Sequence, residues 1–489
     1  MKQSELIGKI ILLLTIQLLV VLPLPAQSKA AQIDSLMRYC YENGVFNGAV
    51  LVAKGGEVLY KNAFGYADPE SQTPLETGSQ FYLASVSKQF TTAAILLLQE
   101  RGKLRVEDPL RKIFPDFPAY ADGVTIAHLM SHTSGIGDHF ELGAYRPGLT
   151  NRDVYELLTR QDSLAFTPGE RFRYSNGGYV LLALIVEKVS GLPYHQFMKA
   201  NFFDPLGMTR TLVYDESRPQ LPARVTGYNG FGDKDDYQIL TSGAGGMYST
   251  VEDLFRWDQA LYAGRPIAPA SQAQAYQPFK LNNDSLLDYG FGWALSDDGQ
   301  GGKIVSHAGD LSGFRSYIER KLGNRYTIIF LTSKGDVVPR PAMRDAIVNI
   351  LGGKSFDLPP IPIALKMAQL IRETGIDQAV AQYPELKRSA PDKYDFSESQ
   401  LNRLGNYFLQ KESLAAALEM FRLNAEAYPD SWKCWDSLGG AQLQAGNPQA
   451  AAGSFEKSLQ LNSDNAHARE MLEKIRVGMT PAEVSPDGG

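Results

Sequence analysis

The chain has 489 residues, 44% hydrophobic and 21% charged, so it reads as a folded protein too long for one ordinary domain. Its formal net charge of −6, with lysine and arginine scattered along the chain, gives no basis for nucleic-acid binding. At the N-terminus, Lys2 and Lys9 precede an apolar run at 10–22, and Ala26 and Ala30 offer small-residue cleavage sites. Residues 1–30 are therefore predicted to be the signal peptide of a secreted or periplasmic protein; the alternative is an uncleaved membrane anchor.

Residues 31–355 begin with a hairpin and end with further strands. Two β-rich runs, 48–53 and 58–64, surround the turn Gly55-Gly56. Strand-like runs return near the end of this region, at 289–295, 303–307, 315–321 and 325–333. Short helices and loops rich in glycine and proline lie between the two sets. This order predicts an α+β domain in which helices flank an antiparallel sheet, with an all-helical subdomain in the middle.

A different periodicity follows the prolines near residue 360. A shift of 34 residues aligns Leu404-Gly405 with Leu438-Gly439 and Phe421 with Phe455, a spacing that resembles the tetratricopeptide repeat. The predicted segments are a linker with leading helices (356–397), two repeats with a capping helix (398–477) and a disordered tail (478–489).

One lysine lies where a helix normally disfavours a positive charge. In Ser85-Val86-Ser87-Lys88, Lys88 falls in the first turn of an apolar helix, where a cation opposes the helix dipole and is poorly solvated. Three residues separate it from Ser85, so both side chains share one helical face. Burial should lower the pKa of Lys88 and make it a base for the Ser85 proton. The two serines, Ser85 and Ser87, are expected to cap the helix.

The setting of this motif matters more than the motif itself, because Ser454 and Lys457 show the same spacing inside the repeats. Ser85 opens a buried helix after a hairpin, the loop Tyr174-Ser175-Asn176 precedes a second buried helix, and His307-Ala308-Gly309 ends a late strand. Together with His132-Thr133-Ser134-Gly135, this ordered set resembles the serine β-lactamase and penicillin-binding protein superfamily. The resemblance covers about residues 40–350. It is strongest to the branch of class C β-lactamases, D-alanyl-D-alanine carboxypeptidases, D-aminopeptidases and esterases.

The resemblance implies an acyl-enzyme mechanism without a cofactor. Ser85 would be the acylated nucleophile, and Lys88 and Tyr174 would share its proton, the neighbouring ammonium lowering the pKa of the phenol. Tyr174 would later protonate the leaving group.

The same resemblance assigns substrate-binding roles. Asn176 would hold the acyl-side amide of the substrate, and the backbone N–H groups of Ser85 and Asp310 would form the oxyanion hole. Gly309 would allow the strand to approach the substrate closely.

The chain departs from class C β-lactamases at one motif. Those enzymes have Lys-Thr-Gly where this chain has His307-Ala308-Gly309. Binding of a substrate carboxylate should then be weaker, or depend on pH through His307. We therefore expect a hydrolase of D-amino-acid peptides, such as cell-wall fragments, or of small esters and amides, rather than a true β-lactamase.

The sequence also allows other interpretations. His132 could suggest a Ser-His-Asp site, but we expect it to be structural, tying down a helix end. An α/β-hydrolase is disfavoured because no Gly-x-Ser-x-Gly motif is present. No metal-ligand spacing occurs among the histidines. Cys40 and Cys434 are either two buried thiols, which we favour, or the two ends of one disulfide bond.

A competing hypothesis is that the protein is a catalytically weak ligand-binding or sensor protein whose repeats hold a protein partner. A purely stabilising role of the repeats also stays open.

Overall fold

The computed structural model describes residues 28–217, 221, 224–237, 239–299 and 301–478. Most of the predicted signal peptide, and all but the first residue of the predicted tail, lie outside this range. No helix within it is long and apolar enough to cross a membrane. Both cysteines it contains, Cys40 and Cys434, are buried free thiols, as the sequence favoured.

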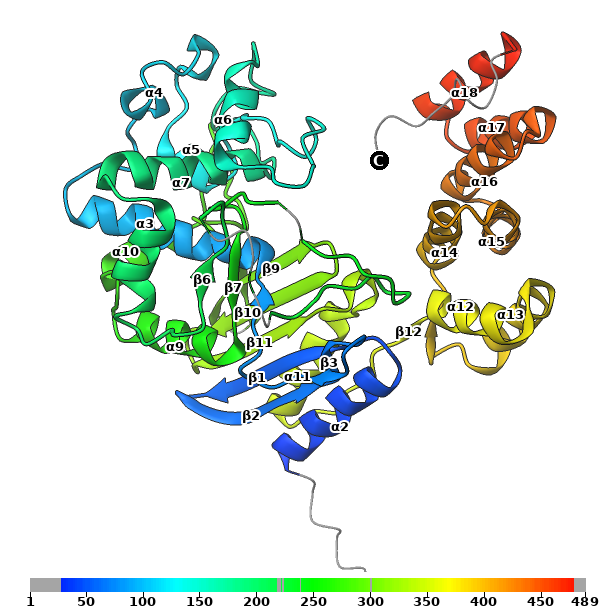
Figure 1. The fold of residues 1–489 in the computed structure, drawn as a ribbon, viewed down its shortest axis with the longest axis horizontal. Coiled ribbons are helices and arrows are strands. Elements are labelled where there is room, and N and C mark those ends of the chain that lie inside the picture. The colour runs from blue at the N-terminus through cyan, green and yellow to red at the C-terminus, as the bar shows by residue number, and fades with distance from the viewer. Residues whose placement is uncertain (1–27, 218–220, 222–223, 238, 300, 479–489) are drawn as a thin grey trace, which may run out of the picture.

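A six-stranded antiparallel sheet, ordered β2-β1-β11-β10-β9-β8, forms the centre of the first domain (Figure 1). Its strands are β1 (Gly48–Lys54), β2 (Glu57–Phe64), β8 (Ala294–Asp297), β9 (Lys303–Leu311), β10 (Phe314–Lys321) and β11 (Tyr326–Thr332). The predicted hairpin and late strands are confirmed, except that β8 begins at Ala294 because Gly290 and Gly292 occupy a turn. Gly48 lies opposite Thr332, so the first strand pairs with the last.

The two faces of the sheet bury different cores because side chains alternate along each strand. Val50 and Val52 pack against α2 (Lys29–Glu42) and α11 (Arg340–Gly352). Leu51 belongs to the larger core on the opposite face, with α3 (Lys88–Glu100) and α9 (Val251–Tyr262). Figure 1 shows α2 and α11 on one side of the sheet and α3 and α9 on the other.

The middle of the chain forms the expected helical subdomain above the sheet in Figure 1. Its central helix, α7 (Asn176–Ser190), is apolar over most of its surface, is mostly buried, and ends at Gly191, whose φ is +74°. The surrounding helices and turns are α4 (Leu110–Ile113), η2 (Ala119–Ala121), α5 (Ile126–Met130), α6 (Asn151–Thr159), α8 (Tyr194–Met198), η3 (Lys199–Phe203) and α10 (Pro269–Ala275).

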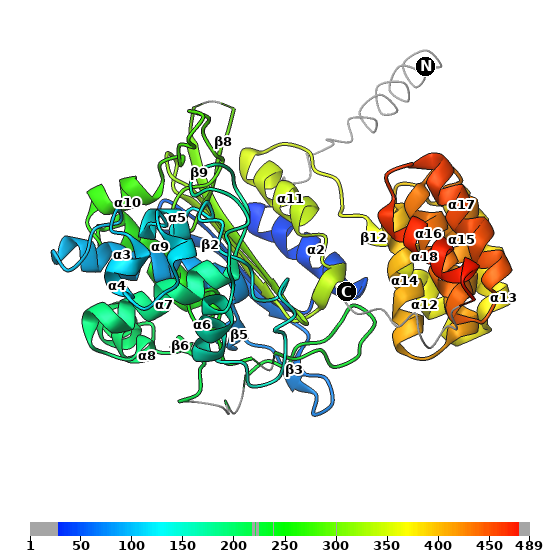
Figure 2. The same cartoon turned by 90° about the horizontal axis from the view of Figure 1, so that it is seen from above.

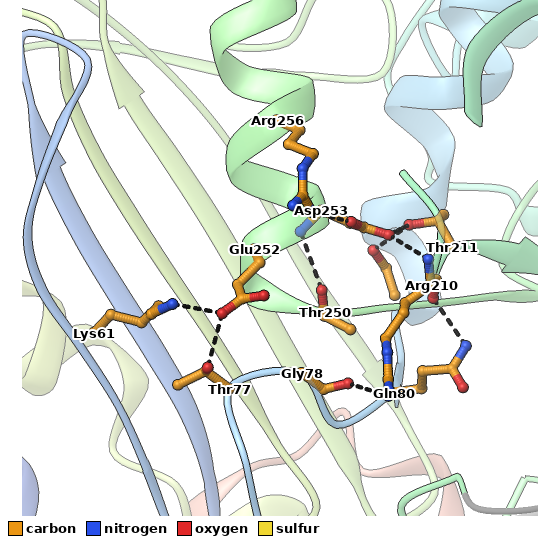
Figure 3. A network of polar contacts seen from close by, with 11 residues as sticks. Lys61, Thr77, Gly78, Gln80, Arg210, Thr211, Thr250, Glu252, Asp253 and Arg256 are labelled. Carbon is orange, nitrogen blue, oxygen red and sulfur yellow. Dashed lines mark hydrogen bonds and ion pairs between the residues drawn. The ribbon is translucent and has the colours of Figure 1, made fainter. Parts of the chain in front are cut away.

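A small sheet, β5-β7-β6, brings the chain to Ser85. Its strands are β5 (Phe81–Tyr82), β6 (Leu212–Val213) and β7 (Met247–Ser249), and a two-stranded ribbon pairs β3 (Tyr66–Asp68) with β4 (Thr73–Pro74). Figure 3 shows how the N-terminus of α9 fixes the segments that enter β5 and β6. Glu252 accepts hydrogen bonds from Lys61 and Thr77, and Asp253 accepts from the Arg210 N–H and the Thr211 hydroxyl.

The C-terminal region is almost entirely helical and lies beside the domain that contains the six-stranded sheet in Figure 2. After η4 (Gly335–Val337) and α11 come β12 (Ile361–Pro362), α12 (Ile363–Thr374), α13 (Ile376–Ser389), β13 (Tyr394–Asp395), α14 (Glu398–Gln410), α15 (Leu414–Ala427), α16 (Trp432–Gln444), α17 (Pro448–Leu461) and α18 (Ala466–Arg476).

The 34-residue period has a direct packing equivalent in these helices. A Cβ at Gly405 would lie 2.7 Å from the Phe421 ring, and a Cβ at Gly439 would lie 2.8 Å from the Phe455 ring. Each phenylalanine therefore covers a glycine of its own helix pair, and Phe421 also packs on Cys434 of the next pair.

Candidate functional site

Ser85 lies on a strained turn where the chain leaves β5. It belongs to the 3₁₀ turn η1 (Ala84–Ser87), which runs directly into α3. Ala84 has φ +45°, a conformation that costs energy for a residue with a Cβ and that often occurs at functional sites. The prediction that the serines cap the helix is wrong, because Ser87 makes no capping bond and Ser85 precedes the helix. The Ser85 side chain instead lines a cavity.

Lys88 is fully buried and has three oxygen partners. Its Nζ lies 3.0 Å from Ser85 Oγ, 2.8 Å from Asn176 Oδ1 and 2.7 Å from the Ala244 carbonyl oxygen. Burial lowers the pKa of Lys88 to about 7, as the sequence predicted, and a nearby carboxylate, Asp138, opposes that shift. The site therefore holds an amine that loses its proton near neutral pH, within hydrogen-bond distance of a serine hydroxyl.

Asn176 reaches Lys88 because Asp138 orients its amide. Asp138 Oδ2 accepts hydrogen bonds from both the backbone N–H and the Nδ2 of Asn176. A carboxylate can only accept and an ammonium can only donate, so Asn176 must direct Nδ2 toward Asp138 and Oδ1 toward Lys88. Nothing in the sequence singled out Asp138, which lies 38 residues before Asn176.

His132 anchors the Tyr174 loop rather than acting on Ser85. Its Nδ1 accepts the Ser175 N–H at 3.1 Å, and its ring stacks on Tyr174 with centroids 4.1 Å apart. Burial lowers the pKa of His132 far below its ordinary value, so the ring is neutral and can keep accepting that N–H. The structural role expected for His132 is found: it holds the Tyr174 loop at Ser175, the N-cap of α7.

Tyr174 is brought beside both Ser85 and Lys88. The Lys88 Nζ lies 4.8 Å from the centre of the Tyr174 ring, and Ser85 hydrogen-bonds the phenol. Burial raises the pKa of Tyr174 well above its ordinary value, an effect larger than the lowering by the Ser85 hydrogen bond. The expectation that the ammonium lowers this pKa is therefore wrong, and Tyr174 is a neutral phenol in the resting site.

Gly309 allows strand β9 to lie against the turn η1 that carries Ser85. A Cβ at this position would fall 2.3 Å from the Leu83 carbonyl oxygen and 3.0 Å from the Ser85 nitrogen. The neighbouring Asp310 lines the cavity, and its carboxylate pairs with Arg315 at 3.1 Å and Arg340 at 2.7 Å. The two arginines thus share one carboxylate, and neither of them lines the cavity.

His307 is held as a neutral ring. Its Nδ1 lies 2.6 Å from the Ala308 carbonyl oxygen and its Nε2 lies 3.0 Å from the Tyr289 hydroxyl, which fits one tautomer with Nδ1–H donating and Nε2 accepting. Burial lowers the pKa of His307 to about 3, with a smaller contribution from Lys88. Since His307 stays uncharged at neutral pH, the pH-dependent carboxylate binding suggested by the sequence is not supported.

These side chains converge on a cavity of about 450 Å³. Ser85, Tyr174, Asn176, His307 and Asp310 all line it, while Lys88 lies just beneath. Tyr82, Phe140, Ile239 and Leu311 give it an apolar wall. Within the described part of the chain, no cluster of three histidine, cysteine or acidic residues could hold a metal ion.

Comparison with known proteins agrees with this geometry. The family profile described as "Beta-lactamase" matches residues 31–351, about two thirds of the chain. The chain belongs to the beta-lactamase family. Penicillin-binding protein 4* of Bacillus subtilis (strain 168) is 38% identical over 361 residues, covering 69% of this chain and 79% of that protein.

Solved structures share the same fold. This beta-lactamase-family chain matches the octameric penicillin-binding protein homologue from Pyrococcus abyssi with a TM-score of 0.60 at 24% identity, covering 70% of this chain and 81% of that one. It also matches EstCE1, described as a hydrolase with promiscuous acyltransferase activity, with a TM-score of 0.56 at 26% identity, covering 66% and 98%. The protein is thus a serine hydrolase of this family, and the family match ends before the C-terminal helices.

Proposed function

We propose that the protein hydrolyses ester or amide bonds through an acyl-enzyme on Ser85. The observation that carries the proposal is Lys88, which is buried, has a pKa of about 7 and lies 3.0 Å from Ser85 Oγ. A free amine in this position can take the serine proton at neutral pH, as activation of a weak nucleophile requires.

The remaining residues supply the other steps. As Ser85 Oγ bonds to the substrate carbonyl carbon, its proton passes to Lys88, and the Ser85 and Asp310 N–H groups stabilise the resulting oxyanion. The neutral phenol of Tyr174 then donates its proton to the leaving group and recovers one from Lys88. The carbon–leaving-group bond breaks, and water later cleaves the Ser85 ester by the reverse proton path.

The charge distribution favours substrates without a carboxylate beside the scissile bond. Among the described residues that line the cavity, His307 is neutral and Asp310 is an anion. No lysine or arginine is among these lining residues, and Arg315 and Arg340, which share the Asp310 carboxylate, lie outside the lining. Esters, amides and D-amino-acid amides whose leaving group carries no carboxylate therefore suit the site better than penicillins, whose carboxylate lies on the amine side of the scissile bond.

The test is intact-protein mass spectrometry after brief exposure to an activated ester, a fluorophosphonate and a penicillin. We expect an adduct with the first two reagents and little with the third. Ser85→Ala should abolish the adducts, while Ser454→Ala, from the matching motif in the repeats, should leave them unchanged. A folded protein that forms no adduct with any reagent would refute the proposal.

We further propose that residues 1–30 direct secretion, which the apolar run between Lys9 and Pro23 supports. N-terminal sequencing of the mature protein should begin at Gln27 or Ala31. An intact Met1 would instead indicate the uncleaved anchor.

A further inference from the structure

A second cavity lies between the hydrolase domain and the C-terminal helices. Its volume is about 540 Å³. The hydrolase side contributes residues 42–44, 230–231 and Lys334, and the other side is formed by α12, β12 and β13. Figure 2 shows the C-terminal helices joined to the domain near β12, at this junction.

Positive side chains dominate the lining of this junction cavity. Lys334, Lys366, Arg372 and Lys393 line it, against the single carboxylate of Glu42. None of the four cations forms an ion pair with any residue that the structure describes. Lys366 Nζ has only a 3.4 Å hydrogen bond to Gln369, and Lys393 lies over the Tyr394 ring.

The same interface neutralises its other cations. Arg403 on α14 pairs with Asp336, and Lys411, the residue that follows α14, pairs with Asp233, each at 2.8 Å and each across the junction. The hydrolase domain thus pairs a carboxylate with each of these two cations, whereas Glu42, the one carboxylate that it places in the lining of the junction cavity, forms no ion pair with the four cations there. This contrast separates the four cations from ordinary interface charges.

Lys334 and Arg372 come from different domains and both line the junction cavity. Burial lowers the pKa of Lys334, and the charge of Arg372 lowers it further. Arg372 is exposed but Lys334 is partly buried, and holding a partly desolvated cation beside a second cation costs free energy unless an anion accompanies them.

We propose that the junction cavity binds a ligand with two or more anionic oxygen groups, carboxylates or phosphates, which bridges Lys334 and Arg372. Arginine presents a planar donor pair suited to both groups, and lysine adds a point charge. The ligand would tie the hydrolase domain to its C-terminal helices. This proposal does not depend on the catalytic one.

The test is calorimetric titration of the full-length protein with inorganic pyrophosphate and with citrate in 0.15 M salt. We expect saturable binding of one molar equivalent of at least one probe, and the tighter probe identifies phosphate or carboxylate chemistry. Lys334→Gln combined with Arg372→Gln should weaken that binding at least tenfold. The control Lys188→Gln, an exposed lysine at the end of α7, should change it less than twofold.

Circular dichroism melting verifies that each variant is folded. If the double variant is not, the exposed Lys393→Gln serves in its place, with an expected weakening of about threefold. No saturable binding of either probe to the unmodified protein overturns the proposal. So does equal weakening by the Lys188 control, which would indicate a general charge effect.

Discussion

The pKa of Lys88 should set the pH dependence of acylation. The reactive form is the free amine, and its fraction rises as pH increases through about 7. Below that value, kcat/KM for an activated ester should rise about tenfold per pH unit, and above it the profile should level off. Lys88→Met should lower kcat/KM by about 10³ and remove this dependence, within the range known for a lost general base. Profiles measured from pH 5 to 9 test this; a flat profile in the unmodified enzyme contradicts it.

Asp138 should act on catalysis only through Asn176 and Lys88. Both Asp138 oxygens accept hydrogen bonds, one from Asn176 and the other from the Phe140 N–H, so Asp138→Asn replaces one of these acceptors with an amide donor. It also removes a negative charge that raises the pKa of Lys88. We expect kcat to fall about 10- to 100-fold with little change in KM, because misplacing a catalytic group by a fraction of an ångström has costs of this size. The acidic limb, the part of the profile where kcat/KM falls as the pH decreases, should also move to lower pH.

Asp138→Glu is the matched variant for this positioning role. It keeps the charge, so the acidic limb should stay near that of the unmodified enzyme even if kcat falls. Should Asp138→Asn lower activity without moving the limb, Asp138 would be structural only.

The sequence identified a site residue correctly where a residue type is unfavourable in its local setting. Lys88 stood out because a cation opens an apolar helix, and the structure gives it the lowered pKa that was expected. Asp138 and the Ala244 carbonyl could not be found this way. They reach Lys88 through loop geometry, and a loop aspartate or a backbone oxygen carries no periodic signal.

The error at Tyr174 has a physical origin. The sequence placed an ammonium beside the phenol but gave no measure of burial, and burial proved to be the larger effect on the pKa of Tyr174. The error at His307 is similar, since the ring was expected to titrate and is instead enclosed beside Tyr289.

At the scale of elements, periodic patterns were the most informative. The hairpin of β1 and β2 and the pairs α14–α15 and α16–α17 follow directly from alternation and from the 34-residue spacing. The boundaries of η1 and β8 were missed because a strained turn and a glycine-rich turn depend on contacts made far away in the sequence.

Two adjacent glycines in α16 test the packing rule of the helix pairs. At Gly439 a Cβ would meet the Phe455 ring at 2.8 Å, whereas at Gly440 nothing lies within 4 Å. Gly439→Ala should therefore destabilise the C-terminal helices by about 1–3 kcal/mol through overpacking. Gly440→Ala should stabilise them by about 0.5–1 kcal/mol, because alanine favours a helix over glycine. Denaturant unfolding of the two variants measures these changes in stability. Equal changes of the same sign would contradict the packing argument.

At the scale of the molecule, the hydrolase domain and the C-terminal helices meet through a loop that also leads to the active site. Phe231 packs on Tyr407 with ring centroids 4.3 Å apart, and Asp233 pairs with Lys411. Further along the same loop, Tyr237 stacks on Tyr82, and Ile239 lines the catalytic cavity. The loop residues that contact the C-terminal helices are thus only a few positions along the chain from a residue that lines the cavity.

Two truncations distinguish a structural from a docking role of these helices. A chain ending at 397 keeps α12 and α13 but loses Leu401, Leu404 and Met420, which complete their core. It should expose Met367 and Leu370 and aggregate. A chain ending at 353 removes that core entirely and keeps both cores of the hydrolase sheet nearly whole.

The chain ending at 353 should therefore stay soluble and keep kcat/KM for an activated ester within about threefold, because none of the described residues that line the cavity lies beyond Leu311. Size-exclusion chromatography and ester turnover of both truncations provide the measurement. If the shorter chain is soluble but inactive, the C-terminal helices hold the loop 228–237 in its active position. If the shorter chain hydrolyses the ester at the normal rate, the C-terminal helices serve in binding, at the junction cavity or along the repeats, and not in catalysis.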